Sequence, residues 1–396
     1  MKILKIQFIP LLLAFLFVQN AIAQSNLKFD TSDYQSVLNR AKTEKKPIFL
    51  MLYATWCPHC HKMQNEVLND PTIVALLNQN FICTWQDIEK SEGIMLKNKF
   101  KTKSLPGFLF LDSNETVLYG LKGEYTVINF ISEIKNALNP TKQLPYLENQ
   151  FTTDSSNGAK CLEYLTTLYK GNERTELSKA AHQYLATQTD AQLLSELNWR
   201  VISNGVTDIS SREFQFVLQH QKEFEAITSP IRVERKIINI VTESLKPFTE
   251  NLDTINYNKQ RQIAQSIHLQ KTDSLIFSYD LLINERSENW SAYKKVAIES
   301  VEKYLWENAS QLKAVAQNFL LHVDDTSSLK EAIKWNKKSL TLNNSYDGNL
   351  LMSRLYLKSL DKNSALKYAS VSKDICVSMG WDLKDVNQLF IEMGIK

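Results

Sequence analysis

Short apolar runs alternate with segments of helical periodicity over the first 140 residues of the chain. The runs 48–53, 81–85 and 108–111 are short and rich in aromatic and aliphatic residues, which predicts buried strands. A fourth run, 116–119, follows a polar turn and predicts a strand that pairs back on the one before it. Apolar residues at three- and four-residue spacing predict the helices 30–44, 58–68, 70–77, 89–100 and 126–138. This order predicts an α/β fold with a mixed sheet flanked by helices.

The pattern changes after residue 139. Residues 140–158 contain two prolines and a Ser-Ser-Asn-Gly run, a composition typical of a linker. From residue 159 to the end, almost every apolar stripe has helical spacing, so we expect an all-α domain at 159–396.

A repeat is visible near the C-terminus. Ala332 and Ala365 are 33 residues apart, and the same offset relates Ser339 to Ser372. This period resembles that of tetratricopeptide repeats, in which each helical pair packs on the next. The resemblance implies a helical-repeat-like domain with small residues where helices approach each other. An ordinary helical bundle is the alternative.

The first residues resemble a secretory signal peptide. Lys2 and Lys5 give a basic start, residues 6–18 form an apolar core, and residues 21–23 are Ala-Ile-Ala, which suits cleavage before Gln24. An uncleaved anchor is the alternative, but the apolar run is short for a membrane span. We therefore expect a signal peptide at 1–23 and an exported, periplasmic protein whose α/β domain covers 24–139, with no stable membrane span after cleavage.

Composition sets few further limits. The chain has 396 residues, enough for two or three domains, and 43% of them are hydrophobic, enough for a sizeable core. The formal charge of +3 falls to +1 without Lys2 and Lys5. A charge so close to zero gives no reason to expect nucleic acid or an anionic membrane surface as a partner.

The candidate chemistry lies in the sequence Trp-Cys-Pro-His-Cys-His at residues 56–61, between a predicted strand and a predicted helix. Pro58 falls at the first helical position, where its missing N–H is not needed. Cys57 then lies at the helix N-terminus, where unpaired N–H groups and the helix dipole stabilise a thiolate. Cys60 is one turn further on, so we expect it to be recessed behind an exposed Cys57 and close enough to form a disulfide.

Three other interpretations of these cysteines exist. The string C-x-x-C-H is also a haem attachment motif, which would need a second axial ligand. Zinc would need two more ligands, and Cys83, Cys161 and Cys376 are isolated in the sequence. A purely structural disulfide would close too short a loop to add much stability. We expect no metal and no cofactor, and three reduced core cysteines, with a Cys161–Cys376 disulfide left open.

Residues 27–139 resemble the thioredoxin-like family, and in particular secreted bacterial members with a Cys-Pro-His-Cys motif. The resemblance is carried by Trp56-Cys57-x-x-Cys60 at the strand–helix junction, by Leu105-Pro106 before the next strand, and by Gly123. It implies a thioredoxin fold and implies that Pro106 is a cis-proline facing the cysteine pair. It also implies that the backbone at Leu105 binds an extended substrate.

Two positions depart from the family pattern. Met51 stands six residues before Cys57, where thioredoxins usually carry a buried acid that accepts the proton of the second cysteine. Glu66 and His61 are candidates for that task. Between the cysteines, Pro58-His59 resembles the periplasmic disulfide-forming oxidases. A histidine there favours the Cys57 thiolate and should raise the reduction potential.

The sequence supports two hypotheses of function. In the first, the chain is an exported thiol–disulfide oxidoreductase in which Cys57 and Cys60 exchange disulfides with envelope proteins, supported by Trp56, Pro58 and His59. The helical domain would then bind a protein partner or shield the site. In the second, the helical domain is an envelope scaffold and the α/β domain is a platform. The direction of electron flow stays open.

Overall fold

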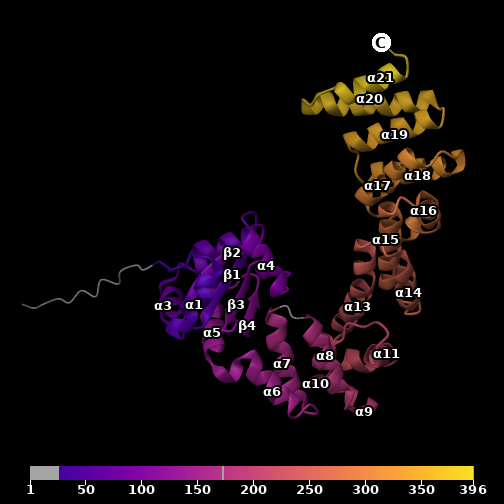
Figure 1. Ribbon diagram of the computed structural model, residues 1–396. Helices are drawn as coiled ribbons and strands as arrows, with labels where there is room; N and C mark the ends of the chain where they lie inside the picture. Colours follow the sequence, from indigo (N-terminus) through magenta and orange to yellow (C-terminus); the bar gives the residue numbers. More distant parts are fainter. Residues whose placement is uncertain (1–25, 172–173, 396) are drawn as a thin grey trace, which may run out of the picture. The chain divides into compact units, whose positions relative to one another are not determined.

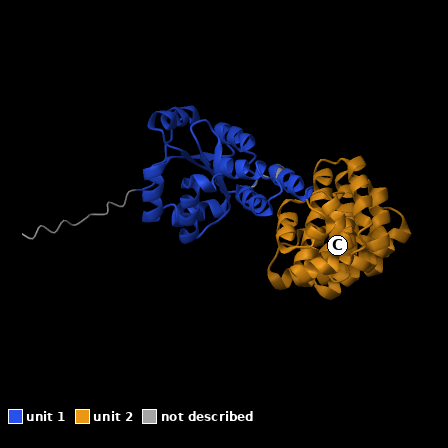
Figure 2. Cartoon of the chain, turned by 90° about the horizontal axis from the view of Figure 1, so that it is seen from below, with its two compact units in different colours: residues 1–187 blue, residues 188–396 orange. Residues whose placement is uncertain are grey.

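The computed structural model describes residues 26–171 and 174–395, which divide into a first unit that ends at residue 187 and a second that begins at residue 188 (Figure 2). The signal peptide predicted for residues 1–23 lies outside the described residues. None of the helices described is both long and apolar enough to cross a membrane.

The first unit is built on a four-stranded mixed sheet in the order β2-β1-β3-β4 (Figure 1). β1 pairs parallel with β2 and antiparallel with β3, and β3 pairs antiparallel with β4. This confirms the predicted mixed sheet and the hairpin at its edge. The strands are β1 (Ile48–Tyr53), β2 (Ile82–Asp87), β3 (Gly107–Leu111) and β4 (Val117–Lys122).

Helices flank this sheet, as the spacing of apolar residues predicts. Asp70 caps α3 by accepting hydrogen bonds from the backbone N–H groups of Thr72 and Ile73, with Pro71 in the first turn. The helix that starts at the cysteine motif continues as a π-helical turn, η1. These elements are α1 (Tyr34–Glu44), α2 (Pro58–Lys62), η1 (Met63–Val67), α3 (Pro71–Asn80), α4 (Ser91–Lys99) and α5 (Val127–Leu138).

The predicted linker at 140–158 is wrong, because most of this segment is helical. It forms the 3-10 turn η2 (Pro140–Lys142) and α6 (Leu144–Thr152). Its two prolines lie in the first turns of these helices, where a missing N–H is tolerated, so they start helices instead of breaking them. Leu147 and Phe151, one turn apart, are both buried. The apolar spacing therefore outweighs the polar composition on which the linker prediction rested.

The first unit also extends past the predicted boundary at residue 139. It includes α7 (Gly158–Gly171) and α8 (Arg174–Leu185), and both α6 and α7 pack against the edge strand β4. Gly120 and Gly171 allow this close approach, because a Cβ atom at Gly120 would lie 3.0 Å from the Cα atom of Gly171. These helices therefore pack over the face of the sheet at β4, where glycine leaves room for α7.

A polar cluster fixes α7 to the sheet. The Lys170 Nζ atom donates hydrogen bonds to both carboxylate oxygens of Glu133, each at 2.8 Å, and to the Tyr119 hydroxyl at 2.9 Å. That hydroxyl donates in turn to Glu133 at 2.6 Å. Burial raises the pKa of Glu133, but hydrogen bonds from Lys170 and Tyr119 outweigh it and hold the pKa below its ordinary value.

The second unit is entirely helical in its described residues. Its helices are α9 (Asp190–Leu193), α10 (Glu196–Gly205), α11 (Arg212–Gln219), α12 (Gln221–Ile227), α13 (Pro230–Glu250), α14 (Thr254–Gln265), α15 (Gln270–Arg286), α16 (Trp290–Tyr304), α17 (Ala309–His322), α18 (Thr326–Leu342), α19 (Tyr346–Lys358), α20 (Lys362–Met379) and α21 (Lys384–Glu392).

The 33-residue repeat corresponds to two successive helical pairs, α17–α18 and α19–α20. Ala332 and Ala365 are fully buried on the second helix of each pair. On the same helices, the Ser339 hydroxyl donates to the Ala309 carbonyl at 2.7 Å, and the Ser372 hydroxyl donates to the Tyr346 carbonyl at 3.0 Å. Both acceptors are the first residue of the preceding helix, so the repeat preserves one inter-helix contact.

We predict that Lys170→Met destabilises a fragment of residues 24–187 by about 1–3 kcal/mol at pH 7, because Glu133 loses its cation. Glu133 has a lowered pKa in the folded state. Its stabilisation is therefore present above its ordinary pKa of 4.5 and disappears as the pH falls through the lowered value. The difference between wild type and variant should shrink accordingly in urea unfolding below pH 4.5.

The matched control is Lys142→Met, which removes a more exposed ion pair with Glu163. An exposed pair contributes at most about 1 kcal/mol. Equal losses for the two variants would contradict a structural role for the Lys170 cluster.

Candidate active site

The cysteine motif lies where β1 ends and α2 begins. Cys57 is the N-cap of α2, and its sulfur accepts a hydrogen bond from the Cys60 backbone N–H at 3.2 Å. Pro58 occupies the first helical position, as predicted. The Cys57 sulfur thus receives an N–H group at the positive end of a helix, an arrangement that favours a thiolate.

The two cysteines differ in exposure, although less than expected. Cys57 is 3% exposed and Cys60 is fully buried. The prediction of an exposed Cys57 is therefore wrong, whereas Cys60 is the more recessed of the two, as predicted. Burial, followed by the hydrogen bond and charge of Cys57, raises the pKa of Cys60 to about 12. Cys60 therefore keeps its proton at neutral pH.

Trp56 stands beside the pair as an exposed aromatic residue. Its side chain is 63% exposed, and its indole N–H donates to the Glu89 carboxylate at 2.8 Å. Exposed aromatic side chains of this size are frequent at surfaces that bind other proteins. Glu89, which fixes the ring, was not singled out from the sequence.

Leu105 and Pro106 lie at the same end of the sheet as the cysteine motif. The Leu105–Pro106 peptide bond is cis, as the resemblance implies. Gly107, the next residue, pairs with Leu52 on β1, five residues before Cys57. The Pro106 carbonyl accepts a hydrogen bond from the Gly123 N–H at 2.8 Å. In the described structure no hydrogen bond involves the Leu105 backbone, which leaves that backbone available to a ligand.

Glu124 is a site residue that the sequence reasoning missed. Its carboxylate bonds the His59 Nδ1 atom at 2.9 Å and forms an ion pair with Lys62, both on α2. The Lys62 bond first, and the His59 bond second, lower the pKa of Glu124. His59 is therefore paired with a carboxylate, so any effect of His59 on Cys57 includes the effect of Glu124. The available signal was an acidic residue directly after Gly123, a position that the resemblance had already selected.

The core position where thioredoxins usually carry an acid is occupied by Met51. Met51 is fully buried on β1, between Trp85 of β2 and Phe108 of β3. Neither proposed substitute replaces it. The Glu66 side chain is exposed to solvent, and the His61 Nε2 atom donates to the Thr55 carbonyl at 2.7 Å.

All five cysteines are free thiols, and all are buried. Burial raises the pKa of Cys83 and of Cys161 to about 12, which makes both poor nucleophiles at neutral pH. The Cys376 thiol donates to the Asp382 carbonyl at 3.1 Å. The Cys161–Cys376 disulfide that the sequence left open is not formed here. Over residues 26–171 and 174–395, no group of three or more His, Cys, Asp and Glu residues could hold a metal ion.

A Cys-x-x-Cys pair at a strand–helix junction, with a cis-proline loop beside it on a four-stranded mixed sheet, defines a thioredoxin fold. Residues 30–113 match the family described as thioredoxin-like.

Parts of the chain are also similar to known proteins. Spermatogenesis-associated protein 20 of Mus musculus is 43% identical over 60 residues, which is 15% of this chain and 8% of that protein. The thiol:disulfide interchange protein DsbD of Yersinia pestis (strain Pestoides F) is 29% identical over 130 residues, 31% of this chain and 21% of that protein. A solved structure titled DsbH Oxidoreductase is 24% identical with a TM-score of 0.28, covering 31% of this chain and 92% of that one. The chain thus spans less than a quarter of these two curated relatives.

We predict that Glu124→Gln increases thiolate formation in the cysteine pair. The change removes the carboxylate that pairs with the Lys62 cation and bonds His59, and cations near the N-terminus of α2 favour a thiolate at Cys57. In a titration of thiolate absorbance near 240 nm, the first midpoint should move to lower pH, and about 1 M salt should reduce the shift.

The control is Glu115→Gln, which removes another carboxylate paired with a lysine, Lys99, in the same unit. It should leave the midpoint in place. A Glu124→Gln midpoint that stays unchanged or rises would show that His59 and Lys62 do not act on the cysteine pair.

Proposed function

We propose that the chain is an exported thiol–disulfide oxidoreductase that exchanges disulfides with proteins through Cys57 and Cys60. The observation that carries the proposal is the asymmetry of the pair. The Cys57 sulfur caps a helix and accepts an N–H bond, whereas the buried Cys60 thiol has a pKa of about 12. Such a pair supplies one attacking and one resolving sulfur.

The reaction has two exchange steps. The Cys57 thiolate attacks one sulfur of a substrate disulfide, a new S–S bond forms, and the other substrate sulfur leaves as a thiolate. Cys60 then loses its proton and attacks the Cys57 sulfur, which releases the second substrate sulfur. The products are a Cys57–Cys60 disulfide and a substrate dithiol, so two electrons pass to the substrate. The reverse sequence oxidises a dithiol.

The proton of Cys60 needs an acceptor for the second step. Met51 supplies none, and the neighbouring His61 is bonded to a backbone carbonyl. We assign the role to the substrate thiolate released in the first step, which is a base formed at the moment it is needed. This route needs no carboxylate in the core beneath Cys60.

The surface around the pair suits an extended polypeptide. The Leu105 backbone can pair with a substrate segment as an added strand, since no hydrogen bond within the described structure involves it. The exposed Trp56 ring, directly before Cys57 in the chain, offers an apolar contact. Pro106 places this backbone at the end of the sheet that carries Cys57.

Two further observations support the proposal. DsbD, which is 29% identical over 130 residues, bears the name of a thiol:disulfide interchange protein. The basic start, apolar core and Ala-Ile-Ala sequence at residues 1–23 support export to the periplasm, where disulfide exchange is chemically suited.

The experiment that tests the proposal is insulin reduction by dithiothreitol, followed as turbidity. The wild-type chain should accelerate it, and Cys57→Ala should abolish the acceleration. Cys83→Ala is the matched control, since it removes a buried cysteine outside the motif, and it should retain activity. Equal rates for wild type and Cys57→Ala would favour the alternative of a helical scaffold.

We also predict that Cys60→Ser accumulates mixed disulfides with exported proteins, because serine keeps the size of Cys60 but cannot resolve the bond to Cys57. Cys57→Ser should trap far fewer partners, since the remaining Cys60 is buried and protonated. Non-reducing gels, with and without dithiothreitol, measure the adducts. Equal trapping by the two variants would reverse the assigned roles.

The reduction potential of the pair should lie between those of thioredoxin and of the strongly oxidising periplasmic oxidase, about −270 and −120 mV. His59 raises it by favouring the Cys57 thiolate, while Glu124 limits that effect by pairing with His59. Equilibration with glutathione buffers measures the value. A potential below that of thioredoxin would show that the Pro58-His59 pair does not act as we describe.

A further inference from the structure

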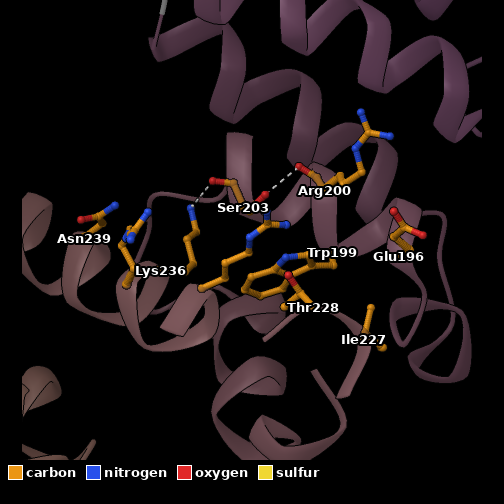
Figure 3. Close-up of a pocket in the computed structure, with 10 residues that line it drawn as sticks. Glu196, Trp199, Arg200, Ser203, Ile227, Thr228, Lys236 and Asn239 are labelled. Carbon is orange, nitrogen blue, oxygen red and sulfur yellow. Dashed lines mark hydrogen bonds between the residues drawn. The ribbon is translucent and has the colours of Figure 1, made fainter. Parts of the chain in front are cut away.

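The helical second unit contains a pocket that the redox chemistry does not use. It has a volume of about 470 Å³ and lies among α10, the end of α12 and the start of α13 (Figure 3). The buried Trp199 of α10 and Ile227, the last residue of α12, give it an apolar side. Pockets of this size commonly hold small organic molecules.

The pocket carries an excess of positive charge. Its lining includes the cations Arg200, Arg232, Arg235 and Lys236, against the single carboxylate of Glu196. No ion pair of the described residues includes Arg200, Arg232 or Arg235, so these guanidinium groups have no protein carboxylate as a partner. Guanidinium groups without a protein carboxylate are the side chains best suited to an external oxyanion.

The four cations are not equivalent. Figure 3 shows the Arg200 side chain pointing away from Trp199, so its guanidinium group lies toward the edge of the site. Lys236 is buried, and its Nζ atom donates to the Ser203 carbonyl at 3.1 Å and to the Val206 carbonyl at 2.5 Å. The Lys236 amino group is therefore held by the protein backbone in the wall of the pocket. Arg232 and Arg235 are exposed and remain the groups available to bind a ligand.

A buried hydroxyl adds an independent sign of an incomplete site. The Thr228 Oγ1 atom is shielded from solvent and has no hydrogen-bond partner, although Thr228 lines the pocket. Buried polar atoms in native proteins are nearly always hydrogen-bonded, and leaving one unpaired is unfavourable. A polar ligand that enters the pocket, with a small movement of the Thr228 side chain, would supply the missing partner.

We propose that this pocket binds a small organic dianion, a phosphate monoester or a dicarboxylate, whose oxyanion is held by Arg232 and Arg235. The apolar side formed by Trp199 and Ile227 takes the organic part of the ligand. The excess of cations over the single Glu196 carboxylate favours a doubly charged ligand over a singly charged one. The pocket belongs to the second unit, whereas Cys57 and Cys60 belong to the first.

Isothermal titration calorimetry of the full chain at low salt tests the proposal with three probes. Phenyl phosphate and benzylsuccinate represent the two oxyanion sources on an aromatic body, and benzyl alcohol is the neutral control. We expect saturable binding of at least one dianion and none of the alcohol. The tighter of the two dianions identifies the source. Equal binding of the alcohol, or no saturation by either dianion at 10 mM, would overturn the proposal.

Charge-removing variants assign the binding to the pocket. Arg232→Gln with Arg235→Gln should weaken dianion binding about tenfold or more, since one charge-assisted contact contributes roughly a factor of ten. Lys246→Gln, which removes another cation from α13 outside the pocket, should change it less than about twofold. If circular dichroism shows that the double variant is unfolded, the two single variants are measured instead. Unchanged affinity in folded variants would overturn the proposal.

Discussion

Burial of the Cys60 thiol is the constraint on which the redox site depends. Cys60 lies fully buried one helical turn behind Cys57, and this burial is the largest cause of its raised pKa. The same turn brings its backbone N–H to the Cys57 sulfur. The first turn of α2 thus keeps the Cys60 thiol protonated and donates a backbone hydrogen bond to the Cys57 sulfur. This difference between the two environments sets which sulfur attacks first.

Features set by local sequence were predictable. The short apolar runs predicted the strands, and Pro58 predicted the start of α2, because these features are set by neighbouring residues. The error at 140–158 has a physical cause. Two prolines and several polar residues suggested a linker. Leu147 and Phe151 are nevertheless buried, in a helix that packs against α7 and β4, and composition does not reveal such contacts.

The site shows the same division. The cysteines, Pro58 and the cis bond at Pro106 were predictable from the motif and from the family resemblance. Glu124 was not, because it reaches His59 only when the segment after β4 is folded against α2. This contact matters for the chemistry, because Glu124 binds His59, the residue that the sequence analysis expected to favour the Cys57 thiolate. A contact of this kind needs the structure, as the two residues are 65 positions apart.

Alkylation of the reduced full-length protein tests the central claim most directly. After a short pulse of iodoacetamide at pH 7, peptide mass spectrometry measures the modification of each cysteine. The account predicts that Cys57 is modified while Cys60 stays free and reacts only as the pH approaches its pKa of about 12. Modification of Cys60 at a rate equal to or greater than that of Cys57 would contradict it.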